Sequence, residues 1–169
     1  MTRVVARRFL VLQTLLLWQG GFLFYSAVVV PEGTDVLGSA AAQGVITRRV
    51  TAWLNPAGLA YLAAAAWDLA LTRDPWPRRV AARWWLWAAA VALLYGLFVL
   101  HNLMSFFMDP AGQAVQLRRE FRVGHVLYMW ASTLHWLFGL AAAYLTLAAW
   151  AAEDRRPLQS SLSPTTEVP

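Results

Sequence analysis

The chain contains no cysteine and no lysine among its 169 residues. Without cysteine it can form no disulfide, no thiolate metal site and no cysteine nucleophile. All 14 basic residues are arginine, a bias that we attribute to a GC-rich coding sequence rather than to a function. Acid–base hydrolysis lacks its pair of carboxylates, nucleophilic catalysis lacks a serine near a histidine and an acid, and no glycine-rich phosphate loop occurs. The sequence therefore contains no complete catalytic motif, which favours a protein that is not an enzyme.

Apolar residues dominate instead, at 59% of the chain with a mean hydropathy of +0.47. Soluble domains use about 45–50% apolar residues. A helix that crosses the hydrocarbon core needs about 20 residues, and four stretches are long enough: about 9–30, 51–71, 84–108 and 123–150. We therefore expect an all-α fold, an integral membrane four-helix bundle over residues 1–152. The first stretch is too long for the apolar part of a secretory signal, so we expect it to be retained.

The arginines cluster at the ends of these stretches, where they act as topology signals. Three arginines precede the first stretch, two lie in the first connection, four in the second, three in the third and two in the tail. The segments on one side of the membrane therefore carry nine arginines and those on the other side carry five. Positive residues are enriched on the cytoplasmic side. We therefore expect the inner (plasma) membrane of a bacterial cell, with both termini in the cytoplasm. The net charge of +5 does not indicate nucleic-acid binding, because no contiguous basic face is present.

Prolines and polar residues mark the expected boundaries. Pro31 should end the first span, and Pro56 should lie in the opening turn of the second. Residues 153–169 are polar and rich in serine, threonine and proline, which predicts a disordered cytoplasmic tail. The segment from Ala111 to Arg122 fits either a short interfacial helix or an N-terminal extension of the last span.

One face of the last stretch collects polar and small side chains. At about 100° per residue the four polar ones fall within an arc of about 80°. The face consists of His125, Tyr128, Ser132, His135, Gly139 and Thr146. Because polar groups are costly in hydrocarbon unless they are paired, this face should turn into the bundle and form interhelical hydrogen bonds.

The histidines also permit a second interpretation, in which the chain binds haem b. Haem b with two axial histidines needs two imidazoles facing each other across the iron. His101 of the third span, paired with His135 or His125, could supply them if helix tilt absorbs an offset of about 7–8 Å. The alternative function is thus a haem b-binding electron-transfer membrane subunit. A transition-metal site has less support, since no close cluster of histidine and carboxylate occurs.

Two further features concern the first two spans. Gly20 and Gly21 remove side-chain bulk where another backbone could approach, so we expect them to serve helix packing. Asp68 lies about one turn inside the cytoplasmic end of the second span, where it could reach the interface and pair with Arg73 or Arg83. A proton or ion path through Asp68 and His135 is the third class of function considered.

The run from Trp18 to Phe24 (WQGGFLF), which leads into Val28–Pro31, and the run from Arg119 to His125 (REFRVGH) carry a family resemblance. The chain resembles the transmembrane protein 205-like family, small four-span proteins with a glycine-containing first helix that ends at proline and an F-x-x-x-H entry to the last helix. The resemblance covers roughly the whole membrane part and extends to Gly20, Gly21, Pro31, Phe121 and His125. The connection after Asp109-Pro110 is longer than the pattern expects.

That resemblance implies a fold and a location, because the family has no established reaction. We therefore expect an accessory or assembly subunit, or a small-solute permeability factor, of the inner membrane. Its expected partners are the lipid bilayer and other membrane subunits. Ten tryptophans on a small bundle give ample apolar surface for such contacts.

Overall fold

A computed structural model describes residues 2–107 and 118–162, and every regular element in those ranges is helical. The first rod is built from α1 (Thr2–Leu15), the π-helical turn η1 (Leu16–Gly20), α2 (Gly21–Phe24), the π-helical turn η2 (Tyr25–Val29) and α3 (Val30–Leu37). Three further rods follow: α4 (Ala40–Leu71), α5 (Pro77–Phe106) and α6 (Arg118–Leu162). The expectation of an all-α fold is confirmed.

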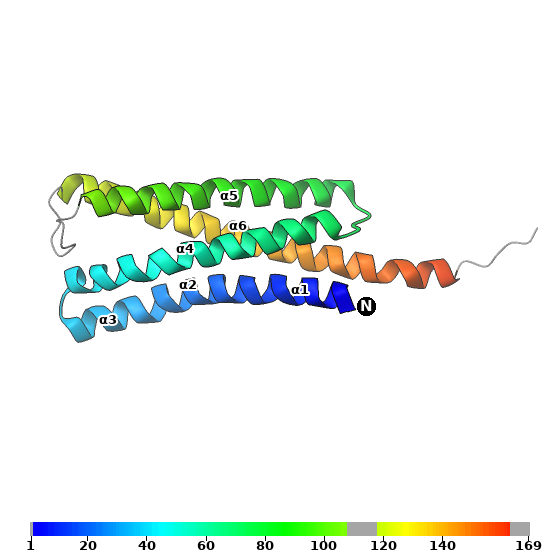
Figure 1. Ribbon diagram of the computed structural model, residues 1–169, viewed down its shortest axis with the longest axis horizontal. Coiled ribbons are helices and arrows are strands. Elements are labelled where there is room, and N and C mark those ends of the chain that lie inside the picture. The colour runs from blue at the N-terminus through cyan, green and yellow to red at the C-terminus, as the bar shows by residue number, and fades with distance from the viewer. Residues whose placement is uncertain (1, 108–117, 163–169) are drawn as a thin grey trace, which may run out of the picture.

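The four rods lie side by side along the long axis of the molecule (Figure 1). The N-terminus, the turn from α4 to α5 and the end of α6 lie at one end, and the turn from α3 to α4 lies at the other (Figure 1). Successive helices therefore run in opposite directions. The first rod packs on α4, α4 packs on α5, and α5 packs on α6.

The turn from α3 to α4 is built from two residues. Gly38 ends α3 with a φ of +60°, a left-handed conformation that glycine adopts without steric cost. Ser39 then caps α4, because its hydroxyl accepts a hydrogen bond from the amide of Ala42 at 3.3 Å. The sequence led us to expect the break at Pro31, but the helix continues past it to Leu37. Pro31 falls in the first turn of α3, directly after the wide turn η2, where its missing amide is tolerated.

The turn from α4 to α5 is fixed by Asp74. Its carboxylate accepts hydrogen bonds from Arg79 Nε and Nη2 at 2.6 and 2.7 Å, and from the Trp76 amide at 3.0 Å. Burial opposes ionisation of this carboxyl group, but the hydrogen bonds from Arg79 and Trp76 outweigh it, so the pKa of Asp74 lies below its ordinary value. The loop is therefore pinned close to the start of α5.

Two helices extend beyond the expected spans. Pro56 lies inside α4, which begins at Ala40 rather than near residue 51. At the other extreme, α6 continues through Leu162, past Glu153, where we expected the polar tail to begin. Ion pairs from Glu153 and Asp154 to Arg8 of α1 hold this part of α6 in place. The composition of the segment did not indicate these pairs. Residues 163–169 of the expected tail lie outside the described residues.

The start of α6 answers part of the question whether the segment before the last span is a separate interfacial helix or an extension of that span. Arg118–Arg122 belong to α6, so this part is an extension of the last helix. The remainder, 111–117, lies outside the described part of the chain.

Three helical segments are long and apolar enough to cross a membrane, within the residues that the structure describes: 3–37, 77–106 and 119–155. Their lengths and hydropathy agree with a membrane protein. The remaining helix, α4, is not among them, and it carries polar and charged residues that include Arg48, Arg49, Asn55 and Asp68.

Large apolar side chains point outward on every rod. The most exposed aromatic ones are Trp53 at 80%, Phe106 at 79%, Trp85 at 77%, Tyr144 at 73% and Tyr95 at 71%. The buried set, in contrast, includes nine polar or charged residues among those described. Exposed apolar side chains of this size on every rod suit lipid or another apolar partner.

The first and last rods come closest where Trp18 of η1 meets Gly139 of α6. A Cβ atom at Gly139 would collide with Gln19 Nε2 and would lie 2.7 Å from the Trp18 ring. Gly58 of α4 supports the same indole, because a Cβ there would lie 3.2 Å from Trp18 Nε1. Gly20, which we expected to serve packing, is exposed and has no atom near its Cβ position, while Gly21 faces only Leu54.

We predict that Gly139→Ala lowers the free energy of unfolding by about 1–3 kcal/mol, the usual cost of overpacking. Gly20→Ala is the matched control, and it should be neutral or stabilise by up to about 1 kcal/mol because alanine suits a helix better than glycine. Unfolding in mixed detergent, followed by circular dichroism, measures both. A Gly20→Ala variant less stable than Gly139→Ala would contradict this account of the contact.

Candidate functional site

The helix α4 turns a line of polar side chains into the bundle. Side chains four residues apart lie one above the other on a helix, and Gln43, Thr47, Thr51 and Asn55 have this spacing, with Asp68 near the end of the same helix. All but Thr47 are buried. We call these five residues and their hydrogen-bond partners the polar seam. It runs along most of the length of α4.

At the end near the turn from α3 to α4, the seam connects α4 to η2. The Tyr25 hydroxyl lies 2.9 Å from Thr47 Oγ1 and donates to it, and Gln43 Nε2 donates to the Tyr25 oxygen at 3.3 Å. Tyr25 is itself buried. The phenol is therefore held between two polar side chains of α4.

In the middle, the seam connects α4 to α5 and α6. Tyr128 of α6 donates from its hydroxyl to Asn55 Oδ1 at 3.2 Å. Thr51 Oγ1 lies 3.4 Å from His101 Nδ1 of α5. Ser132, one turn beyond Tyr128 on α6, is also buried. Tyr128 and Ser132 thus face inward, as the sequence pattern led us to expect of them.

His135 occupies the centre of the bundle, with 2% of its surface exposed. Its ring centroid lies 4.3 Å from that of Trp18, and Trp18 in turn stacks on Tyr61 at 5.4 Å. Beside them, Gln19 Nε2 donates to the carbonyl oxygen of Trp136 at 2.9 Å and so connects η1 to α6. His135 Nε2 has no hydrogen-bond partner among the described residues.

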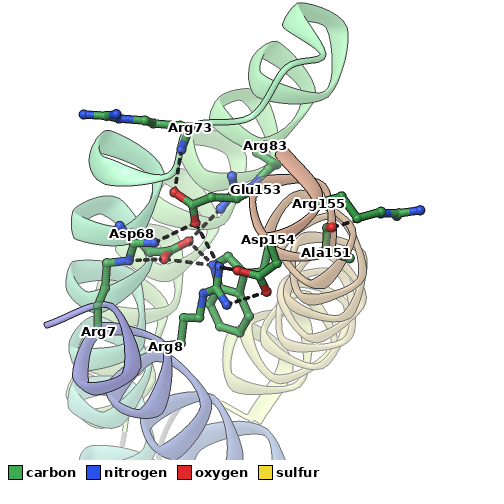
Figure 2. A network of polar contacts seen from close by, with 10 residues as sticks. Arg7, Arg8, Asp68, Arg73, Arg83, Ala151, Glu153, Asp154 and Arg155 are labelled. Atoms are coloured by element: carbon green, nitrogen blue, oxygen red, sulfur yellow. Dashed lines mark hydrogen bonds and ion pairs between the residues drawn. The ribbon is translucent and has the colours of Figure 1, made fainter. Parts of the chain in front are cut away.

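At the other end, Asp68 is fully buried and joins all four rods (Figure 2). Arg83 of α5 donates from Nη2 to Oδ2 at 2.8 Å, and Trp150 of α6 donates from Nε1 to both oxygens at 3.0 and 3.1 Å. Arg7 of α1 completes the set, with Nε 2.9 Å from Oδ1, an ion pair without hydrogen-bond alignment. The expected pairing of Asp68 with Arg83 is thus present, together with two partners that we did not expect.

A second layer of charges surrounds Asp68 toward the end of the bundle (Figure 2). Arg8 donates to Glu153 at 2.9 Å and to Asp154 at 2.8 and 2.9 Å, while Arg7 donates to Glu153 at 3.2 Å. Glu153 also accepts from the Arg73 amide at 3.1 Å. We call the six charged side chains the charge cluster: Arg7, Arg8, Asp68, Arg83, Glu153 and Asp154. Three positive and three negative charges leave it neutral.

Some of the predicted site residues are buried in the bundle and others are exposed. His135, Tyr128, Ser132 and Gly139 are buried on the inner face of α6. His125 is exposed, and its ring stacks on Phe121 with centroids 6.3 Å apart. The inclusion of His125 in the inward face is therefore wrong. Its position lies about 60° from Tyr128, at the edge of the buried stripe, and Gly124 takes the inner position against Met104.

Haem b does not fit the histidines as they are packed. The ring of His135 is covered by Trp18, and the cavity that His135 lines has a volume of about 20 Å³. Such a volume has room for about one water molecule. His101 is half-buried and turns Nδ1 toward Thr51. Binding haem between α5 and α6 would require these helices to repack.

The charge cluster and the polar seam of α4 were not predicted as sites. A signal for the seam exists in the sequence, since Gln43, Thr47, Thr51 and Asn55 repeat at four-residue spacing. The charge cluster has a weaker sequence pattern, because its members come from segments up to 146 residues apart in the chain.

Comparisons of the chain with protein-family models, with curated proteins and with solved structures give no match. The function must therefore be argued from the geometry.

We predict that Asp68→Ala lowers the free energy of unfolding by about 3–5 kcal/mol, because it leaves the buried guanidinium groups of Arg7 and Arg83 without their counter-charge. Asp154→Ala is the matched control: its side chain is 61% exposed, so its loss should cost about 1 kcal/mol or less. Thermal unfolding in detergent, with chemical unfolding for the free energies, compares the two. Equal losses would show that Asp68 does not organise the bundle.

Proposed function

We propose that all four rods, α4 included, cross the inner membrane. The observation that carries this proposal is the set of large apolar side chains exposed on every rod, together with the polar seam inside the bundle. The polar residues of α4 lower its hydropathy, but Gln43, Thr51, Asn55 and Asp68 are buried against the other helices. The exposed residues of α4 include Trp53, Leu59 and Trp67, which suit lipid. A helix need be apolar only on the face that meets lipid.

We further propose that both termini lie in the cytoplasm. The start of α1, the turn from α4 to α5 and the end of α6 share one end of the bundle (Figure 1), and the segments at this end hold nine of the 14 arginines. The positive-inside rule places that end in the cytoplasm. Three of these nine arginines belong to the neutral charge cluster. The positive-inside rule therefore depends on the remaining six arginines at this end, compared with five arginines at the opposite end.

Within the membrane, we propose that the protein acts as an accessory or assembly subunit without a reaction of its own. The polar groups of the seam pair mainly with one another, and two cavities in the described part each measure about 20 Å³. The surface that remains available to a partner is the apolar exterior. We keep the resemblance to the transmembrane protein 205-like family as a proposal about fold and location.

A small-solute permeability factor is the second form of this proposal, and the polar seam is the observation in its favour. The packing favours the first form, because Asp68 is held between two guanidinium groups and an indole and is not free to carry a proton or an ion. Trp18, which stacks on Tyr61 and contacts the His135 ring at a tilt, fills the middle of the seam.

The absence of native cysteine makes the topology directly testable with single-cysteine variants. We predict that Val36→Cys, at a position 83% exposed near the turn from α3 to α4, reacts with a membrane-impermeant maleimide in intact spheroplasts. Trp76→Cys, at a position 64% exposed in the opposite turn, should react only after the membrane is permeabilised. The reverse pattern would invert the orientation, and labelling of both sites in intact spheroplasts would mean that α4 does not cross the membrane.

The role as a subunit predicts a protein neighbour on one lipid-facing side. A photo-crosslinking amino acid is placed at Trp53 of α4, Tyr95 of α5 or Tyr144 of α6, all more than two-thirds exposed. Irradiation of whole cells should give a discrete protein adduct from one or two of these positions and lipid adducts from the rest, with unirradiated cells as the control. Lipid adducts alone at all three positions would contradict the proposed role.

A further inference from the structure

A small polar cavity lies between η1, α4, α5 and α6, in the middle of the polar seam. It has a volume of about 20 Å³, and its wall includes Thr51, Asn55, Tyr128, Ser132 and His135. Trp18, Phe22, Leu54 and Leu97 complete the wall with apolar surface. All five polar side chains are at least nine-tenths buried. The cavity is therefore deeply buried, and polar side chains make up part of its wall.

Two atoms of this wall have no hydrogen-bond partner in the described residues: Asn55 Nδ2 and His135 Nε2. The Asn55 amide has a defined orientation, since its Oδ1 accepts from Tyr128 at 3.2 Å, so Nδ2 presents its hydrogens elsewhere. A buried polar atom that stays unpaired is costly to the folded state. Two residues that line the cavity thus contribute one unpaired donor and one ring nitrogen that can accept.

We propose that this cavity is a binding site for one water molecule, which accepts a hydrogen bond from Asn55 Nδ2 and donates one to His135 Nε2. A water needs about 10–15 Å³ of such space and two to four polar partners. The cavity meets the first requirement. Beyond Asn55 and His135, three residues with hydroxyl groups, Thr51, Tyr128 and Ser132, also line the cavity and could accept from such a water.

The chemistry of the wall selects water over an ion. No carboxylate and no arginine lines the cavity, so neither a cation nor an anion would find a counter-charge there. The ligand must be neutral, as small as water, and able both to donate and to accept. Bound in this way, water would connect His135 to the Asn55–Tyr128 pair and fix His135 in the tautomer that carries its proton on Nδ1.

The composition of the chain allows a selective test. It has three histidines and two asparagines, and His125 and Asn102 are exposed, so they serve as internal references. Protein labelled with ¹⁵N in these residue types is reconstituted into liposomes, and magnetisation transfer from water protons to the side-chain nitrogens is measured by solid-state nuclear magnetic resonance.

We expect transfer to both His135 and Asn55 in the unmodified protein, with the shift of an unprotonated Nε2 at His135. Asn55→Leu removes the donor, and Ser132→Val adds bulk to the cavity wall. Each should reduce transfer to His135 by about threefold or more, because the water loses a partner or its space. Asn102→Leu is the matched control and should leave the transfer unchanged.

Two results would overturn the proposal. Absence of water transfer to His135 in the unmodified, folded protein would mean that the cavity is dry. Transfer that is unchanged in both folded variants would mean that these atoms do not hold the water. Circular dichroism and size-exclusion chromatography report whether each variant folds, and the measurement on the unmodified protein decides the question even if neither variant does.

Discussion

The buried carboxylate of Asp68 is the constraint on which the arrangement of the four rods depends. Taking a carboxylate out of water costs several kcal/mol unless ion pairs and hydrogen bonds compensate for it. Here compensation comes from Arg7 on α1, Arg83 on α5 and Trp150 on α6. Because each partner sits on a different helix, only one register of the bundle satisfies Asp68. The outer pairs of Arg8 with Glu153 and Asp154 then hold the ends of α1 and α6 together.

The rest of the polar seam contributes to specificity more than to stability. Interhelical hydrogen bonds within a membrane average about 0.6 kcal/mol, so the contacts of Tyr25 and Tyr128 with α4 are individually weak. Their spacing along α4 nevertheless excludes a shifted register, since a slide by one turn would leave several buried donors unpaired. The charge cluster therefore fixes one end of the bundle, and the hydrogen bonds extend the same register toward the other end.

The helical class and three of the four expected apolar segments follow from hydropathy, because length and apolar content are local properties. Helix ends follow less well. Pro31 and Pro56 lie within helical segments, since the wide turn η2 and the packing of α4 override their local preference. Periodicity placed Tyr128, Ser132 and His135 on the inner face of α6 but could not show that His125 lies beyond its edge. The partners of Asp68 were harder still to predict from the sequence. Trp150 is 82 residues away, and pairing across such a distance leaves no local pattern.

The π-helical turns explain how the first rod can supply both bulk and hydrogen bonding to the centre of the bundle. Within η1 the adjacent residues Trp18 and Gln19 are both buried, although neighbours on a regular helix point about 100° apart. The indole packs on His135, and the amide reaches the backbone of α6. Both fit only because Gly139 leaves their space open. Turns of this type are frequent at functional sites, and this one borders the cavity at His135. The cavity beside this turn is therefore lined by residues from all four rods.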